Sequence, residues 1–177
     1  MARTAQLGLP LALAIIGGQP ARFKPFIDLY RQVAREAGHA DSTARVSINS
    51  HGYVADTSQQ AAEEHYPAMQ ALMAKIGRER GWPPMSRAQF DADRGPNGHL
   101  LLGSPQEVID KMLLEHEVFR YDRFLIQFSV GTIPHDRMMH SIELLGTRVA
   151  PEVRKATAPA APAPAAGTAA PTTEATA

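Results

Sequence analysis

The C-terminal part of the folded chain carries a clear strand-and-helix pattern. Residues 124–130 form an apolar run broken only by Gln127 and Ser129, which is typical of a strand buried on both faces of a parallel sheet. A turn rich in glycine and proline follows. Apolar residues then recur every three or four positions over 135–149, which predicts an amphipathic helix that Pro151 ends. A buried strand that feeds a helix is half of a βαβ unit.

The same pattern occurs twice earlier in the chain. Residues 9–16 are continuously apolar and predict a buried strand, and a helix is expected over 21–37. A second strand is predicted over 46–54, with Asn, Ser, His and Gly near its end. Residues 57–80 then begin with a Thr-x-x-Gln capping box and continue as a long helix.

The remaining segments are an excursion, one more helix and a tail. Residues 81–103 are rich in Trp, Pro and Gly and predict an irregular excursion, and loops of that length are usually functional or mobile. A second capping box, Ser104-Pro105-Gln106-Glu107, begins a helix over 105–119. Residues 156–177 are almost wholly Ala, Pro, Thr and Gly, which predicts a disordered tail behind a folded part at 1–155.

Strands that alternate with helices predict an α/β fold with a parallel sheet and right-handed crossovers. Three predicted strands are few for such a sheet. Both of its edges and one of its faces are expected to lack cover, which suggests an incomplete domain.

The amino-acid composition argues against several classes of function. Lys plus Arg equals Asp plus Glu, 18 against 18, so the basic face of a nucleic-acid-binding protein is not expected. The absence of cysteine excludes disulfides, Cys-ligated zinc and a catalytic thiol, and agrees with a cytoplasmic location. The seven histidines show no H-E-x-x-H spacing, and there is no G-x-G-x-x-G or Walker motif. We therefore expect no metal, no Rossmann site and no P-loop.

The first residues have a second interpretation. A basic start followed by the apolar stretch 7–16 superficially resembles a signal peptide. The stretch is too short to span a membrane, and Pro10 interrupts it. A buried strand is the favoured interpretation, and a secreted protein with a cleaved leader stays as an alternative.

Short segments spread over residues 1–154 carry a family resemblance. They are RTAQLGLP at 3–10 with YR at 30–31 and Gly38, HGYVADT at 51–57, GSPQEV at 103–108, DRF at 122–124, and SIELLG at 141–146 with VAP at 149–151. In order and spacing they resemble the C-terminal half of the bacterial luciferase-like, flavin-dependent oxidoreductases and monooxygenases. No one motif is diagnostic, but the ordered set is fairly specific.

The resemblance implies part of a (β/α)8 TIM barrel, about strands six to eight with their helices. A complete barrel needs about 250 residues. It also implies FMN, or alternatively the deazaflavin coenzyme F420, and a small organic substrate. In the family, much of the flavin contact and the best-known catalytic histidine come from the N-terminal half. The catalytic residues of this chain are therefore unknown, and we expect a truncated or split protein that is inactive alone.

A second reading of the same resemblance is a half-barrel without catalytic function. Such a half-barrel would assemble with a second copy of itself or with a separately encoded N-terminal half. The unpaired strand edges motivate this alternative, because exposed edges recruit partners.

The chemistry of a barrel lies at the C-terminal ends of its strands. Five cofactor-binding or pocket candidates are expected there: Gly17, Gly18, His51, Ser129 and Gly131. Glycines let a planar ring or a phosphate approach the backbone, but a plain turn role is the favoured interpretation of these glycines. His51 is a candidate hydrogen-bond donor or proton carrier near neutral pH, or a histidine that holds a strand end. Ser129 and Gln127 are expected to point into the barrel.

Overall fold

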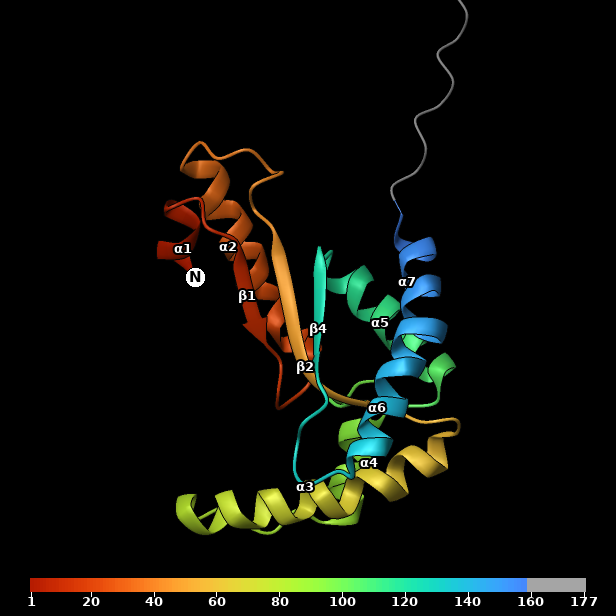
Figure 1. Ribbon diagram of the computed structural model, residues 1–177. Helices are drawn as coiled ribbons and strands as arrows, with labels where there is room; N and C mark the ends of the chain where they lie inside the picture. The colour runs from red at the N-terminus through yellow and green to blue at the C-terminus, as the bar shows by residue number, and fades with distance from the viewer. Residues whose placement is uncertain (159–177) are drawn as a thin grey trace, which may run out of the picture.

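The computed structural model describes residues 1–158 (Figure 1). Its elements in chain order are α1 (Ala2–Gln6), β1 (Leu11–Ala14), the short helix η1 (Pro20–Phe23), α2 (Lys24–Glu36), β2 (Val46–Val54), α3 (Ser58–Arg80), α4 (Arg87–Arg94), β3 (Leu101–Gly103), α5 (Pro105–Phe119), β4 (Arg123–Gln127), α6 (His135–Leu144), the π-helical turn η2 (Leu145–Val149) and α7 (Ala150–Thr157). The predicted tail lies outside the described residues from 159 on, and its first two residues belong to α7.

The strands form one open parallel sheet around β2. Strand β1 pairs with β2 from Leu11 opposite Val46, and β4 pairs with the same part of β2, with Phe124 opposite Ile48. These two strands therefore occupy opposite edges of β2. The short β3 pairs with the end of β2, with Leu101 opposite Gly52. The predicted α/β class with parallel strands is confirmed, and the sheet is not a closed barrel.

Helices cover one face of the sheet. Residues of α2, including Ile27 and Tyr30, pack with Val46 and Ile48 of β2 in one core cluster. Helices α5 and α7 and strands β3 and β4 contribute to a second cluster. The opposite face is uncovered, because every second residue of β1 and β4 is exposed. This agrees with the predicted lack of cover on one face.

Helix α3 crosses beyond the C-terminal ends of the strands, and α4 lies beside it (Figure 1). A third core cluster joins these helices to the ends of β2 and β3 through Tyr53, Met69, Phe90 and Leu100. The excursion at 81–103 is therefore not irregular as predicted. The Ser86 hydroxyl accepts a hydrogen bond from Gln89 N at 3.1 Å and so caps α4.

The prediction that the last strand is buried on both faces is wrong. Phe124 and Ile126 of β4 are half-buried against the helices, whereas Leu125 and Gln127 are exposed on the uncovered face. An apolar run alone does not distinguish a strand with one covered face from a strand with two.

Pro151 does not end the last helix as predicted. The π-helical turn η2 comes directly before it, and the chain continues as α7 with this proline in its first turn. A proline is tolerated in a first turn because the N–H that it lacks is not needed there. Of the two predicted capping boxes, Ser104–Glu107 is complete, whereas the Gln60 side chain bonds Glu64 instead of the cap.

No helix among the described residues is both long enough and apolar enough to cross a membrane.

Candidate functional site

The carboxyl ends of the parallel strands meet at one edge of the sheet, next to α3 and α4. Gly17 and Gly18 follow β1, His51 lies in β2, and Ser129 and Gly131 follow β4. The register places His51 opposite Gln127 of β4. Ser129 and Gln127 are both exposed.

Gly17 and Gly18 leave the backbone open at the end of β1. A side chain added at either glycine would meet no atom within 4 Å. Gly18 has φ of +75°, a conformation that favours glycine. It lines a cavity of about 450 Å³ together with Gln19, Arg22, Gln89, Ala92, Asp93, Asn97 and Gly98.

Gly131 has a packing role. Its φ is +77°, and an added Cβ would lie 2.4 Å from the carbonyl oxygen of Ala68 in α3. Only glycine allows this loop to approach the helix so closely. The turn interpretation of this residue therefore explains it without a ligand.

His51 is buried within β2, opposite the last residue of β4, with 9% of its surface exposed. Its Nδ1 makes no hydrogen bond to any described residue. Burial lowers the pKa of the ring below its usual value. The imidazole is therefore neutral near pH 7.

Two further buried histidines, which the sequence did not single out, interact electrostatically with His51. His65 of α3 is fully buried, and its ring lies 5.7 Å from that of Tyr53 and stacks 6.1 Å from that of Phe90. Burial, with a smaller contribution from His51, lowers the pKa of His65 to about 4. The signal for His65 was its place on the apolar face of α3, between the buried Ala61 and Met69.

His99 precedes β3 and is also buried. Its Nδ1 lies 3.7 Å from Asp93 Oδ1, and burial lowers its pKa while Asp93 opposes the shift. Within residues 1–158, no three His, Cys, Asp or Glu side chains are placed to hold a metal ion.

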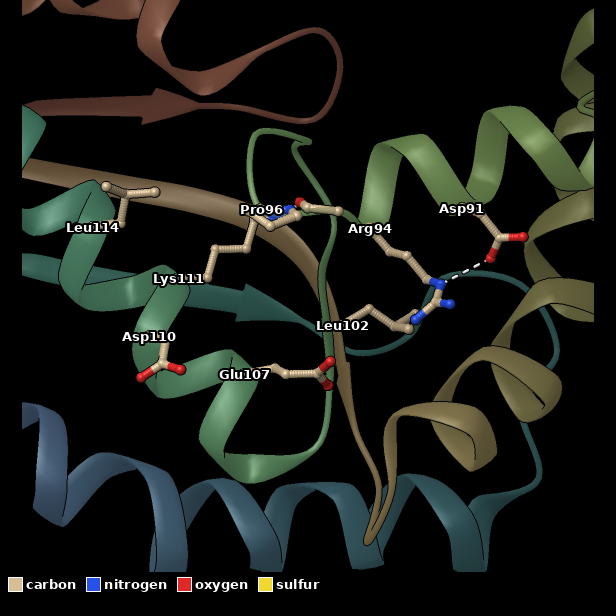
Figure 2. A pocket seen from close by; sticks show the side chains of 9 residues that line it. Asp91, Arg94, Pro96, Leu102, Glu107, Asp110, Lys111 and Leu114 are labelled. Atoms are coloured by element: carbon tan, nitrogen blue, oxygen red, sulfur yellow. Dashed lines mark hydrogen bonds and ion pairs between the residues drawn. The ribbon is translucent and has the colours of Figure 1, made fainter.

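A second polar site, also missed from the sequence, lies on the covered face beneath α5. The Lys111 Nζ donates to the carbonyls of Gly95 at 2.8 Å and Leu100 at 2.7 Å. Burial lowers the pKa of Lys111 to about 8. Figure 2 shows this side chain reaching from α5 toward Pro96, and the ion pair of Arg94 Nε with Asp91 Oδ1 at 2.8 Å.

The cavity in Figure 2 has a volume of about 380 Å³. Its wall consists of Asp91, Arg94, Gly95, Pro96, Leu102, Glu107, Asp110, Lys111 and Leu114. Both of its cations are engaged, one by a carboxylate and one by carbonyls. The cavity therefore offers no free positive charge to an anionic ligand.

Glu115 lies one turn after Lys111 and is 4% exposed. Neither of its carboxylate oxygens accepts a hydrogen bond within the described chain. Burial raises its pKa to about 7, and the positive charge of Lys111 opposes the shift. The sequence could have indicated this pair, because Lys111 and Glu115 fall on the same helical face as the buried Val108, Met112 and Phe119 of α5.

The half-open parallel sheet, with its polar groups at the carboxyl edge, is the architecture of part of a (β/α) barrel. The model of one family, described as luciferase-like monooxygenase, matches residues 1–120. The chain belongs to this luciferase-like monooxygenase family. A comparison with curated proteins finds no match.

Solved structures share the fold at low sequence identity. The monooxygenase RslO1 from Streptomyces bottropensis has a TM-score of 0.67 and 20% identity, over 85% of this chain and 44% of its own. The oxygenating constituent of 3,6-diketocamphane monooxygenase from Pseudomonas putida, in complex with FMN, has a TM-score of 0.62 and 17% identity, over 86% and 45%.

A coenzyme F420-dependent tetrahydromethanopterin reductase from Methanopyrus kandleri is also similar, with a TM-score of 0.57 and 16% identity, over 86% of this chain and 47% of its own. The chain thus spans less than half the length of these three relatives.

Proposed function

We propose that the chain supplies the C-terminal part of the active site of a flavin-dependent oxidoreductase, a monooxygenase of the luciferase-like family that acts on a small organic substrate. The observation that carries the proposal is His51, a buried imidazole of β2 that lies opposite the last residue of β4 and whose Nδ1 has no partner among the described residues. FMN is the first choice of cofactor and coenzyme F420 the second, because relatives of both kinds share the fold. The lack of cysteine supports a cytoplasmic location.

The residues at the carboxyl edge fit such a cofactor. The open backbone at Gly17 and Gly18 admits a planar ring or a phosphate, since no atom lies within 4 Å of a side chain added there. A neutral His51 can donate to, or accept from, a polar atom of the cofactor or substrate. The bound flavin supplies the redox chemistry, and the protein supplies orientation and a dry pocket.

Helix α3 and the α4 segment contribute by covering the ends of the strands, where the cluster of Tyr53, Met69 and Phe90 excludes water. The histidines in contact with this cluster are neutral near pH 7. This end of the sheet is therefore dry without carrying a fixed positive charge, which favours close packing of an aromatic ring.

We further propose that catalysis needs the remaining strands of the barrel, joined to this sheet. The support is the uncovered face, on which Ile16 is 50% and Leu125 42% exposed, together with the free edges of β1 and β4. The second candidate function is a half-barrel without catalytic activity that assembles with itself or with a separate N-terminal half. The same uncovered face supports that candidate.

The test is a titration of the chain with FMN and, separately, with coenzyme F420, in which fluorescence measures binding. We expect no saturable binding to the chain alone. We expect one-to-one binding when residues 1–158 follow strands one to five of a full-length family member in one polypeptide. A monomeric, folded fusion of this kind that binds neither cofactor would contradict the oxidoreductase proposal. Saturable binding by the chain alone would contradict the need for further strands.

His51 is tested in the same fusion. Changing His51→Ala should weaken flavin binding by about tenfold, the effect of losing one hydrogen bond to a buried polar group. His39→Ala is the matched control, because His39 is half-buried and bonds Gln6 O, near the N-terminal end of β1.

A further inference from the structure

A groove runs between α5, α7 and the covered face of β4, three elements that Figure 1 shows side by side. Its volume is about 340 Å³, within the range of about 300–1,000 Å³ that is typical of small-molecule sites. It shares no lining residue with the cavity of Figure 2 or with the cavity at Gly18. The groove is therefore a separate feature of the molecule.

The walls of the groove are apolar along most of their length. They are formed by Met112 of α5, by Phe124 and Ile126 of β4, and by Leu145 and Val153 of the last helical segments. All five side chains belong to one core cluster, so packing holds the walls in place. Walls of this kind suit an aliphatic chain, to which the flexible methionine can adapt.

Two arginines stand at one end of the groove. Arg123 is the first residue of β4, and Arg154 lies in the last turn of α7. Because α7 runs back along β4 in the opposite direction, the start of the strand and the end of the helix lie at the same end of the groove (Figure 1). Both arginines are exposed and both line the groove, so a ligand there can reach their guanidinium groups.

Neither arginine is neutralised by a neighbour. No carboxylate among residues 1–158 lies within 4.0 Å of either guanidinium group. Asp122 is the single acidic residue among the described residues that line the groove, and its Oδ2 accepts a 2.8 Å hydrogen bond from Val46 N. Burial lowers the pKa of His116, which also lines the groove, so this ring is neutral near pH 7. The groove therefore has an apolar body and a cationic end.

The π-helical turn η2 is an independent indication of a site. It comprises Leu145–Val149, and its first residue lines the groove. Turns of this kind are rare in proteins and occur frequently at functional sites. The position of η2 beside an apolar groove with a cationic end agrees with ligand binding there.

We propose that this groove binds a free aliphatic carboxylate of medium chain length, whose carboxylate pairs with Arg123 and Arg154 while its chain lies along the apolar walls. Arginine binds a carboxylate through two parallel N–H···O bonds. The groove lies between two helices, which suits a single molecule in solution and not the plane of a bilayer. The arginines lie at the amino end of β4, whereas the proposed flavin site is at the carboxyl edge. This binding therefore does not depend on a flavin.

The experiment is a calorimetric titration of the chain with sodium octanoate at pH 7.5, below the concentration at which octanoate forms micelles. The comparison solutes are 1-octanol, which lacks the charge, and sodium acetate, which lacks the chain. We expect saturable one-to-one binding of octanoate and at least tenfold weaker binding of both comparison solutes. Added sodium chloride should weaken octanoate binding, because salt screens the two arginines.

The double change Arg123→Gln with Arg154→Gln should weaken octanoate binding by at least tenfold, because it removes both charges. Both positions are exposed, so this variant should fold as the native chain does. Arg148→Gln is the matched control, since Arg148 is exposed in η2 and does not line the groove. It should bind octanoate as the native chain does.

A second variant keeps both arginines. Ala150→Phe places a ring in the groove and should also weaken octanoate binding by at least tenfold. Amide NMR shifts caused by octanoate should centre on residues 112–126 and 145–157.

Three results would overturn the proposal. The first is the absence of saturable octanoate binding to the native chain, even if the chain pelleted with phosphatidylglycerol vesicles. The second is full octanoate binding by the double arginine variant or by Ala150→Phe. The third is saturable binding whose NMR shifts centre on residues 9–18, next to the exposed Ile16, because this would place the ligand on the uncovered face of the sheet.

Discussion

Lys111 and Glu115 lie one turn apart on the buried face of α5, yet only the lysine has partners. Its Nζ donates to Gly95 O and Leu100 O, whereas the Glu115 carboxylate accepts no hydrogen bond among the described residues. Helix α5 therefore uses one buried charge to fix the loop after α4 and leaves a second unsatisfied.

Glu115→Gln should stabilise the free protein. Burial raises the carboxyl pKa from 4.5 to about 7 in the folded state, so the folded chain binds a proton that the unfolded chain releases between these values. The free energy of unfolding contributed by this group therefore falls as pH rises from about 4.5 to about 7, by up to about 3 kcal/mol. Urea unfolding at pH 5 and pH 7.5 measures the change. The variant should lose this part of the pH dependence, and Glu117→Gln should keep it.

Lys111→Met should destabilise the chain by about 2–4 kcal/mol, because it leaves two buried carbonyls without their donor. It also removes the cation nearest to Glu115. Amide hydrogen exchange should show the greatest loss of protection in the loop 95–100. Lys75→Met on the exposed side of α3 is the control and should change stability by less than about 0.5 kcal/mol. Equal effects of the two changes would contradict the role assigned to Lys111.

Ser141→Ala should cost about 1–3 kcal/mol of stability. The buried Ser141 Oγ of α6 accepts a 2.7 Å hydrogen bond from Val54 N at the end of β2, and its loss leaves that N–H unpaired. Chemical unfolding gives the value. The exposed Ser129→Ala is the matched change and should be nearly neutral; a similar loss there would show that the hydroxyl of Ser141 is not specifically required.

His51 and His140 should titrate on opposite sides of 6.5. Burial lowers the pKa of His51, whereas the hydrogen bond from His140 Nε2 to Asp56 Oδ2, at 3.0 Å, raises that of His140. Imidazole resonances followed by NMR from pH 4.5 to 8.5 will show the order. Asp56→Asn should lower the pKa of His140 and leave His51 unchanged. A reversed order would exclude the neutral state assigned to His51.

Gly131→Ala should destabilise more than Gly38→Ala, although both glycines have φ near +80°. The side chain at 38 would meet no atom within 4 Å, whereas at 131 it would lie 2.4 Å from Ala68 O. Both changes cost about 1–2 kcal/mol because alanine is strained at positive φ. Gly131→Ala adds a steric clash to that cost. Thermal unfolding of the two variants separates the terms, and equal losses would show that the loop yields to the clash.

The sequence predicts the long elements of this fold well and the short ones poorly. The apolar run at 9–16, the strand at 46–54 and the helix after Ser104 stand out because their patterns extend over many residues. Strand β3 has three residues and α4 has eight. These elements are too short to show a periodic pattern, and they are defined by the tertiary contacts of residues such as Phe90 and Leu101. Of the site, the sequence identifies His51 from its place near a strand end.

The sequence does not identify the Lys111–Glu115 pair or the buried His65 and His99. Ionisable residues on a helix are exposed by default, and only the packing of α5 against the loop after α4 buries these. Gly131 shows the reverse. The sequence shows that this residue is a glycine, but it does not show why. The reason is the close approach of Gly131 to the backbone of α3 at Ala68.

The π-helical turn η2 sets the phase of the last helix. The buried residues of α6 end with Leu144, and those that follow are Val149 and Val153, so the apolar stripe steps by five residues where it crosses the turn. One residue corresponds to about 100° of rotation in an α-helix. Deleting a single residue from 145–149 would restore regular helical geometry and turn the valines away from α5. The length of this turn therefore determines which side of α7 packs against α5. Homologues should conserve this length more strictly than the residue types within the turn.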